Sequence, residues 1–259
     1  MTLGMSLYDW PLFGKRKFMG IQNYQDALTD AGFIHALLFT AQFTLIVTPV
    51  LFVIGMALAL LFQRNRRGVG LFRAVVFIPV VIGFATASNL WVWALNSKVG
   101  LLDAIMVDLG ISERPIEWLA NPSWALFWIV VLTVWKTAGF TMLLLMVGMQ
   151  SIPEDYYDAA KLDGANAMRR FIYITLPLLR RQIALVLILA VIASFLSFDQ
   201  FFIITGGGPE NKTITAVFWI YRAGFIQFKL GYAAALSVLL MITLVIVSAV
   251  QLRLLREED

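Results

Sequence analysis

Residues 33–63 read FIHALLFTAQFTLIVTPVLFVIGMALALLFQ, without a single Asp, Glu, Lys or Arg. The hydrocarbon core of a bilayer is about 30 Å thick, so a helix that crosses it needs about 20 apolar residues. This stretch exceeds that length, and Pro49 within it is tolerated where neighbouring helices bond the freed backbone groups. It predicts a helix that spans a membrane, and it places the chain among membrane proteins.

Four further apolar blocks follow, and with the first they predict five spans. They cover residues 74–97, 123–149, 182–204 and 230–252, and the charges within them are Lys136 and Asp199. The chain is 60% hydrophobic and 14% charged, whereas soluble domains are about 25% charged. We therefore expect an all-α polytopic membrane helix bundle. The shorter apolar stretch 216–226 contains Arg222 and is expected to form an external interfacial helix.

Lys and Arg are concentrated in alternate connections between these blocks, which indicates the orientation. The connections after the first and third blocks and the C-terminus carry Arg64, Arg66, Arg67, Arg73, Lys161, Arg169, Arg170, Arg180, Arg181, Arg253 and Arg256. The loop 98–122 has two basic and four acidic residues, Glu113 among the latter. Because cytoplasmic loops carry the excess of Lys and Arg, we expect a cytoplasmic C-terminus. Residues 1–32 then read as an external loop, and we expect a sixth helix to precede them.

The residues needed for several kinds of chemistry are missing from the sequence. It has no Cys and one His, which excludes disulfides, Cys-ligated zinc and a thiol nucleophile. The glycines 206–208 precede Pro209 and Glu210, whereas a phosphate-binding P-loop needs Gly-Lys-Ser/Thr. The scattered basic residues have no nucleic-acid motif around them. We therefore expect no enzyme activity, no metal or cofactor in this chain and no nucleic-acid partner.

The connection 150–181, between the third and fourth blocks, is the most informative part of the sequence. Ser151 and Glu154 have the spacing of a helix capping box, with Pro153 in the first turn. Gly164 suits the position just after the end of this short helix. The sequence thus predicts a well-delimited short helix on the cytoplasmic side.

A second short helix is expected over residues 165–174, ending at Leu176 and Pro177 before the chain re-enters the membrane. Ala159 and Ala160 leave one face of the first helix smooth enough for another surface to approach closely. From the residues alone, an amphipathic pair packed under the bundle is as good an interpretation as a docking element.

The spacing in this connection resembles the EAA loop of the permease subunits of ABC importers. It contains Asp158-Ala159-Ala160, three residues, Gly164, nine residues and Ile174-Thr175-Leu176-Pro177. In that family the first short helix is the coupling helix, which docks in a cleft of a cytoplasmic ATPase. Asp158 stands where Glu is usual, which keeps the charge and shortens its reach. The resemblance implies that coupling to the ATPase involves Glu154, Asp158, Ala159, Ala160, Gly164, Leu176 and Pro177.

Two further stretches are similar to the first permease of maltose-, lactose- and glycerol-3-phosphate-type importers. They are Thr205-Gly206-Gly207-Gly208-Pro209, followed by Thr213 and Gly231-Tyr232, and Gly20-Ile21-Gln22-Asn23-Tyr24. The resemblance runs from about Tyr8 to Arg253. It implies import of a sugar or related polyol across a bacterial or archaeal cytoplasmic membrane. It also implies a second permease, usually a different chain, two ATPase subunits that bind ATP and Mg, and an external substrate-binding protein.

Lys136 and Asp199 are charges inside expected spans. Each costs about 2.5–3.5 kcal/mol at the centre of a membrane helix on insertion scales, so such residues are first considered for function. One interpretation is that Asp199, Gln200 and Lys136 line the translocation path and bind substrate hydroxyls. The other is an interhelical ion pair, or an Asp199 that lies at the outer interface.

The expected organisation is a single permease domain, residues 1–259. Its parts are the first three spans (33–149), the cytoplasmic EAA-type coupling loop (150–181), and the last two spans with the external interfacial helix (182–253). Two other classes of membrane protein remain alternatives. A secondary transporter would require inverted repeats and ion-coupling residues within the spans, whereas a non-transporting scaffold subunit would not require the spaced loop.

Overall fold

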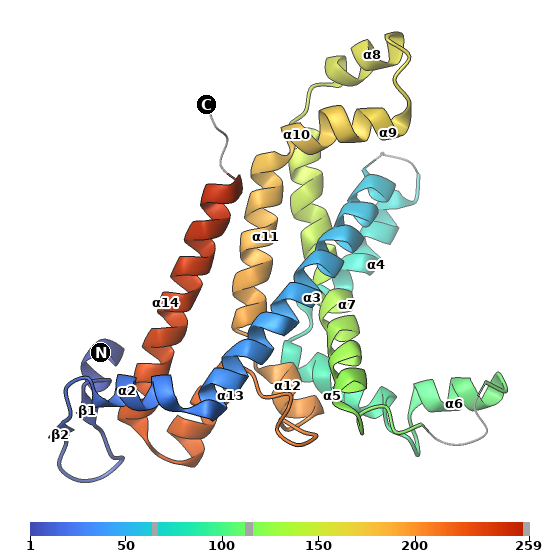
Figure 1. The fold of residues 1–259 in the computed structure, drawn as a ribbon. Helices are drawn as coiled ribbons and strands as arrows, with labels where there is room; N and C mark the ends of the chain where they lie inside the picture. The colour runs from blue at the N-terminus through green and yellow to red at the C-terminus, as the bar shows by residue number, and fades with distance from the viewer. Residues whose placement is uncertain (64–66, 112–115, 256–259) are drawn as a thin grey trace. The chain divides into compact units, whose positions relative to one another are not determined.

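The computed structural model describes residues 1–63, 67–111 and 116–255, which are almost entirely helical (Figure 1). Arg64, Arg66, Glu113 and Arg256, which contribute to the expected orientation, lie outside the described residues. Within the described ranges, four segments are long and apolar enough to cross a membrane. They are α3 (Ala31–Phe62), α7 (Pro122–Gln150), the pair α11 (Arg180–Phe195) and α12 (Asp199–Ile204), and α14 (Leu230–Leu255). The pair α4 (Val69–Val81) and α5 (Phe84–Ala94) can supply a fifth span, so the expected all-α polytopic bundle is confirmed.

The chain divides into two compact units. The first unit comprises residues 1–46, 83–132 and 192–247, and the second comprises residues 47–82, 133–191 and 248–259. Each of the helices α3, α7, α11 and α14 has one end in the first unit and the other end in the second. Each unit has its own set of packed helices, and the two sets are described in turn.

The apolar block 74–97 forms two helices instead of the continuous span that the sequence predicts. Ile82 (φ −72°, ψ 133°) and Gly83 (φ −60°, ψ 146°) are extended and separate α4 from α5. Pro79, in the last turn of α4, cannot donate a helical hydrogen bond, and Gly83 has a weak preference for the helix. Hydrophobicity does not report this break, because the residues on both sides of it are apolar.

In the first unit, residues 1–32 have more structure than a loop. They form α1 (Thr2–Met5), a hairpin of β1 (Tyr8–Asp9) and β2 (Lys17–Phe18), and α2 (Gln22–Thr29). The buried Asn23 organises them, because its Nδ2 donates to the carbonyl oxygens of Ser6 (2.8 Å) and Tyr8 (3.0 Å). The hairpin lies against the start of α14, where a Cβ on Gly231 would collide with the carbonyl oxygen of Tyr8.

Buried hydroxyl groups connect the helices of the first unit, which also include α6 (Leu101–Asp108) and α13 (Ala216–Tyr221). Ser194 Oγ donates to Thr44 Oγ1 (2.9 Å), and the Ala216 amide donates to Thr40 Oγ1 (2.9 Å). Thr215 Oγ1 donates to the Ser197 carbonyl (2.8 Å), which attaches α13 to the segment before α12. Helix α13 continues into a π-helical turn (Arg222–Ile226), so the short helix expected over 216–226 is present.

In the second unit, a buried apolar cluster joins α3, α7 and α11. It includes Met56, Met142, Leu145, Met146 and Leu179. Glycines let the helices approach closely, as small residues do between membrane helices. A Cβ on Gly139 of α7 would lie 2.5 Å from the carbonyl oxygen of Val76 in α4. This packing supports the connection 150–181 where it leaves α7 and where it enters α11.

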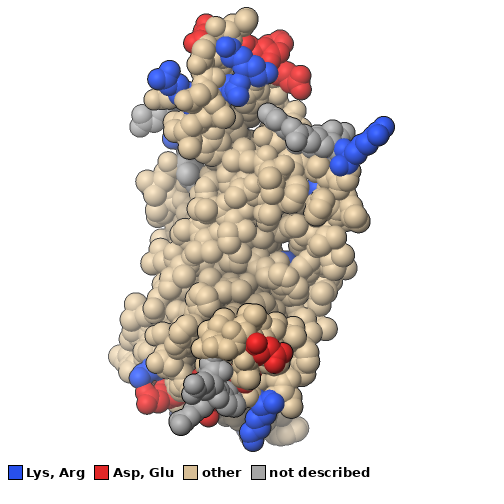
Figure 2. Space-filling model, turned by 90° about the vertical axis from the view of Figure 1, so that its right-hand side faces the viewer, with Lys and Arg blue, Asp and Glu red and all other residues tan. Residues whose placement is uncertain are grey.

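The connection 150–181 contains four short helical elements. They are α8 (Glu154–Leu162), α9 (Ala167–Arg170), a π-helical turn (Phe171–Thr175) and α10 (Leu176–Leu178). Helices α8 and α9 lie past the ends of α7 and α11 (Figure 1). Charged side chains gather over them, whereas the adjoining surface of the second unit is almost free of charge (Figure 2).

Candidate functional site

The start of α8 differs from the capping box that the sequence predicts. Helix α7 continues to Gln150, so the hydroxyl of Ser151 donates to the Gly148 carbonyl (2.7 Å) at the end of α7. Helix α8 begins at Glu154, after Pro153 in an extended conformation (φ −58°, ψ 138°). The capping-box prediction was therefore wrong, because Ser151 completes the preceding helix. Glu154 contributes instead as an acidic residue in the first turn, where the helix dipole favours negative charge.

The end of α8 is as expected. Gly164 has a φ of +76°, in the left-handed region that suits glycine. Its amide donates to the Lys161 carbonyl (3.0 Å), and the Ala165 amide donates to the Ala160 carbonyl (2.8 Å). These two bonds make a Schellman motif, which satisfies carbonyl groups at the helix end. The motif gives α8 a fixed length and a defined exit direction.

Helix α8 is displayed on the surface of the second unit. All nine of its residues are described and none is buried. Asp158 and Ala159 are exposed, Ala160 is half-buried, and Asp158 pairs with Lys161 at 2.6 Å. Both charged side chains of that pair are more than half exposed, so the pair contributes little stability. Asp158 and Ala159 are thus available for a partner.

The second half of the loop is more continuous than the sequence predicts. Asn166 caps α9 by accepting a hydrogen bond from the Arg169 amide (2.9 Å). Helical structure then runs through the π-helical turn to Leu178, so Leu176 and Pro177 lie inside it instead of ending it. Leu176 packs against the buried apolar cluster. The loop thus returns to the base of the second unit through a nearly unbroken helical path.

A cavity of about 770 Å³ lies beside α8 within the second unit. Its lining includes the charged residues Glu154, Asp158, Lys161 and Arg170. Methionine, isoleucine and phenylalanine side chains from the end of α7 and the following segments form its apolar part, namely Met146, Met149, Ile152 and Phe171. Helix α8 is therefore not packed tightly on this side.

The three residues predicted for the translocation path are placed as follows. Lys136 is 6% exposed in α7, and its Nζ lies 3.5 Å from the carbonyl oxygen of Val80 in the second unit. Asp199 is half-buried in the first turn of α12, and Gln200 beside it is 2% exposed, both in the first unit. The ion pair between Lys136 and Asp199 and the contact of these residues with substrate stay predictions.

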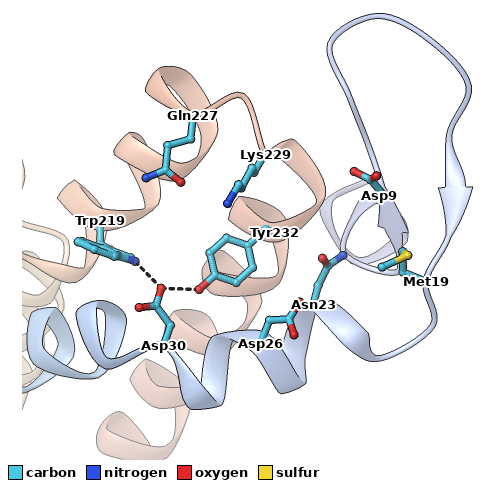
Figure 3. A pocket seen from close by; sticks show the side chains of 9 residues that line it. All are labelled: Asp9, Met19, Asn23, Asp26, Asp30, Trp219, Gln227, Lys229 and Tyr232. Atoms are coloured by element: carbon cyan, nitrogen blue, oxygen red, sulfur yellow. Dashed lines mark hydrogen bonds between the residues drawn. The ribbon is translucent and has the colours of Figure 1, made fainter.

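The first unit carries a second hollow that was not anticipated from the sequence (Figure 3). Its volume is about 490 Å³, and Asp30 lies at the centre of a hydrogen-bonded group within it. The Asp30 carboxylate accepts from Tyr232 Oη (2.6 Å), Trp219 Nε1 (3.1 Å) and the Gly32 amide (2.8 Å). These bonds fix the junction of α2 and α3 to α13 and the start of α14.

The same hydrogen bonds determine the charge state of Asp30. Burial by itself raises the pKa of this carboxyl, but the bonds from Tyr232, Gly32, Trp219 and Phe33 outweigh burial and lower it. Asp30 is therefore ionised at neutral pH. Trp219 and Tyr232 follow Asp30 by 189 and 202 residues along the chain, so no local pattern could have pointed to this group.

The comparisons with known proteins concern nearly the whole chain. The family described as "Binding-protein-dependent transport system inner membrane component" matches residues 51–257. The trehalose/maltose transport system permease protein MalF of Thermococcus litoralis is 34% identical over 247 residues, which are 95% of this chain and 82% of that protein. The sulfoquinovosyl glycerol transport system permease protein SmoG of Agrobacterium fabrum is 33% identical over 94% of this chain and 78% of that protein.

A solved structure shows the same fold. It is the crystal structure of a bacterial alginate ABC transporter in complex with an alginate pentasaccharide-bound periplasmic protein. One of its chains matches 92% of this chain and 83% of its own length, with a TM-score of 0.83 at 20% sequence identity. The helical arrangement is thus shared at a level of identity where the sequences have largely diverged.

Proposed function

Because this chain belongs to the family of inner-membrane components of binding-protein-dependent transport systems, and is thus a permease subunit of an ABC importer, we propose that α8 is its coupling helix. The observation that carries the proposal is the exposure of a helix whose end is firmly terminated. None of the residues of α8 is buried, although the Schellman motif at Gly164 stops it at a defined point. A helix built in this way can present Asp158, Ala159 and Ala160 to another protein without losing its shape.

The partner that fits this face is a cytoplasmic ATPase with a complementary cleft. Glu154 and Asp158 give it acidic groups, and the two alanines allow close approach of another backbone. The energy source lies in the ATPase, where ATP and Mg bind. On the same proposal, the C-terminus lies in the cytoplasm, a second permease completes the path, and an external binding protein delivers the substrate.

The substrate class that we propose is a sugar or a related polyol. The two relatives are named for trehalose and maltose and for sulfoquinovosyl glycerol. The transporter of similar fold acts on alginate, which is also a carbohydrate. Lys136, Asp199 and Gln200 remain our candidates for contact with substrate hydroxyls, and their buried or half-buried positions inside apolar helices support that role.

The proposed mechanism is alternating access driven by the ATPases. When the ATPases close on ATP, they displace α8, and the helices that follow the loop move with it. This movement exposes the path to the external binding protein, and hydrolysis reverses the movement. The nearly unbroken helical path from α9 to α11 supports such transmission, because a helix moves as a stiff element.

Cysteine cross-linking tests this proposal. Ala159→Cys in the complete transporter is expected to cross-link to the ATPase and to resist an impermeant thiol reagent added from outside. Leu28→Cys, on the exposed surface of α2, is the matched control, expected to react from outside and to form no such cross-link. An Ala159→Cys protein that is labelled from outside, or that never cross-links in an assembled complex, would refute the coupling role.

A further inference from the structure

Helix α8 is attached to the second unit through one aromatic side chain. Tyr157 is half-buried and packs against the buried apolar cluster of α3, α7 and α11. The other residues of α8 are exposed, except for the half-buried Ala160. Alanine offers a single methyl group for packing, so the orientation of α8 depends mainly on Tyr157.

The hydroxyl group of Tyr157 adds a directional contact. It lies 3.0 Å from Oγ1 of Thr175, a residue that is 5% exposed at the end of the π-helical turn. Thr175 Oγ1 in turn lies 3.4 Å from the Arg170 carbonyl, to which it can donate. Either hydroxyl group can donate in the bond between Tyr157 and Thr175, so removal of either hydroxyl group removes the bond.

Thr175 is connected to α11 by consecutive backbone hydrogen bonds. Its carbonyl accepts from the Leu179 amide (3.0 Å), and the Leu179 carbonyl accepts from the Ile183 amide (2.8 Å). Leu179 is 1% exposed in the buried cluster, whereas Ile183 is already inside α11. A displacement of Tyr157 is thus passed to the start of a membrane helix through bonded groups.

The cavity beside α8 shows why this bond matters. Tyr157 and Thr175 both line the space of about 770 Å³, so van der Waals packing holds α8 only incompletely on that side. A helix beside unfilled volume can rotate or shift without collision unless a specific contact prevents it. The hydrogen bond between these two residues supplies such a contact.

We propose that the Tyr157–Thr175 hydrogen bond is the joint that makes α11 follow α8, so that Tyr157 and Thr175 are positioning residues for coupling. The proposal rests on the coupling role of α8 and adds the pair through which that role is carried out. Without the bond, α8 still docks on the ATPase, but part of its movement is absorbed in the cavity. ATP hydrolysis then continues with less substrate imported for each ATP.

The test uses the complete transporter in proteoliposomes, with ATP hydrolysis and substrate uptake measured on the same samples. Tyr157→Phe and Thr175→Val each remove the bond while keeping the volume of the side chain. Each is expected to lower substrate imported per ATP by about two- to tenfold, the range that one net hydrogen bond corresponds to. The double variant is expected to be no worse than either single variant, because both remove the same bond.

Tyr156→Phe is the matched control, since Tyr156 is the neighbouring tyrosine on α8 and is 54% exposed. It is expected to keep the wild-type ratio of transport to hydrolysis. An unchanged ratio in Tyr157→Phe, with Ala159→Cys still cross-linking to the ATPase, would refute the role of the hydrogen bond and leave the coupling role of α8 intact. If Ala159→Cys without any other substitution does not cross-link to the ATPase, the coupling role of α8 is refuted instead. Additive losses in the double variant would also contradict a shared bond.

Discussion

Replacement of Gly139 by alanine tests how closely α4 and α7 approach in the second unit. A Cβ at this position would lie 2.5 Å from the Val76 carbonyl oxygen, 3.0 Å from Phe77 Cα and 3.1 Å from the Val76 carbonyl carbon. All three atoms belong to the backbone of α4, so no side chain can rotate away. The two helices would have to separate by roughly 0.5–1 Å before ordinary van der Waals distances are restored.

The size of the effect follows from this geometry. Overpacking of a well-packed core costs about 1–3 kcal/mol, and a clash with backbone falls in the upper part of that range. Alanine also has a better helix propensity than glycine, by about 1 kcal/mol, which offsets part of the cost. We therefore expect Gly139→Ala to lower the free energy of unfolding by about 1–2 kcal/mol.

Gly70→Ala provides the matched control. Gly70 also lies in α4, in its first turn, and a Cβ there would meet no atom of another helix within 4 Å. This variant is expected to be neutral or slightly stabilised by the same gain in helix propensity. The difference between the two variants, about 2–3 kcal/mol, isolates the clash.

The assay is thermal unfolding of the purified complex in detergent, followed by the loss of the monodisperse peak in size-exclusion chromatography. For a chain of this size, 1 kcal/mol corresponds to about 2–4 °C in Tm, so the two variants should differ by roughly 4–12 °C. Equal melting temperatures for Gly139→Ala and Gly70→Ala would refute the close approach of α4 and α7.

Three further outcomes are expected. Gly164→Ala should lower the extent of cross-linking between Ala159→Cys and the ATPase about fivefold, because a left-handed backbone costs a residue with a side chain about 1 kcal/mol. Gly164→Asn should lower the cross-linking less, because asparagine tolerates that conformation, and equal effects of the two variants would contradict the explanation. Asp30→Asn should destabilise the protein at pH 7 by about 1 kcal/mol, because hydrogen bonds to an ionised carboxylate are stronger than those to an amide. The folded-state pKa of Asp30 lies below its ordinary value of 3.8, so this stabilisation is complete above pH 3.8 and is lost as the pH falls through the folded-state pKa. If the melting temperatures of wild type and Asp30→Asn differ as much at low pH as at pH 7, the ionised carboxylate is not the source of the stabilisation. Asp199→Asn should reduce substrate uptake while the complex still assembles, and unchanged uptake would remove Asp199 from the translocation path.

The sequence by itself determined the features that depend on neighbouring residues. The length of an apolar block sets whether a helix can cross a bilayer, so residues 33–63 and 230–252 predicted α3 and α14 without knowledge of their neighbours. Gly164 was identifiable for a similar reason, because the positive φ after a helix is a local requirement that glycine meets best. The spacing from Asp158 to Pro177 also lies within one short segment, so the resemblance to the EAA loop could be noticed from the sequence, whereas the coupling role stays a proposal.

Only the tertiary structure decided which groups at these positions meet. Ser151 satisfied a capping pattern, but α7 ends directly before it, and its hydroxyl donates to the Gly148 carbonyl instead of accepting from an amide of α8. The Asp30–Trp219–Tyr232 group joins residues far apart in sequence, and the bond between Tyr157 and Thr175 joins two separate helical elements of one loop. In both cases the packing of helices selects the partners. A hydrogen bond of this kind depends on distance and direction in space, and neither quantity is encoded in the order of nearby residues.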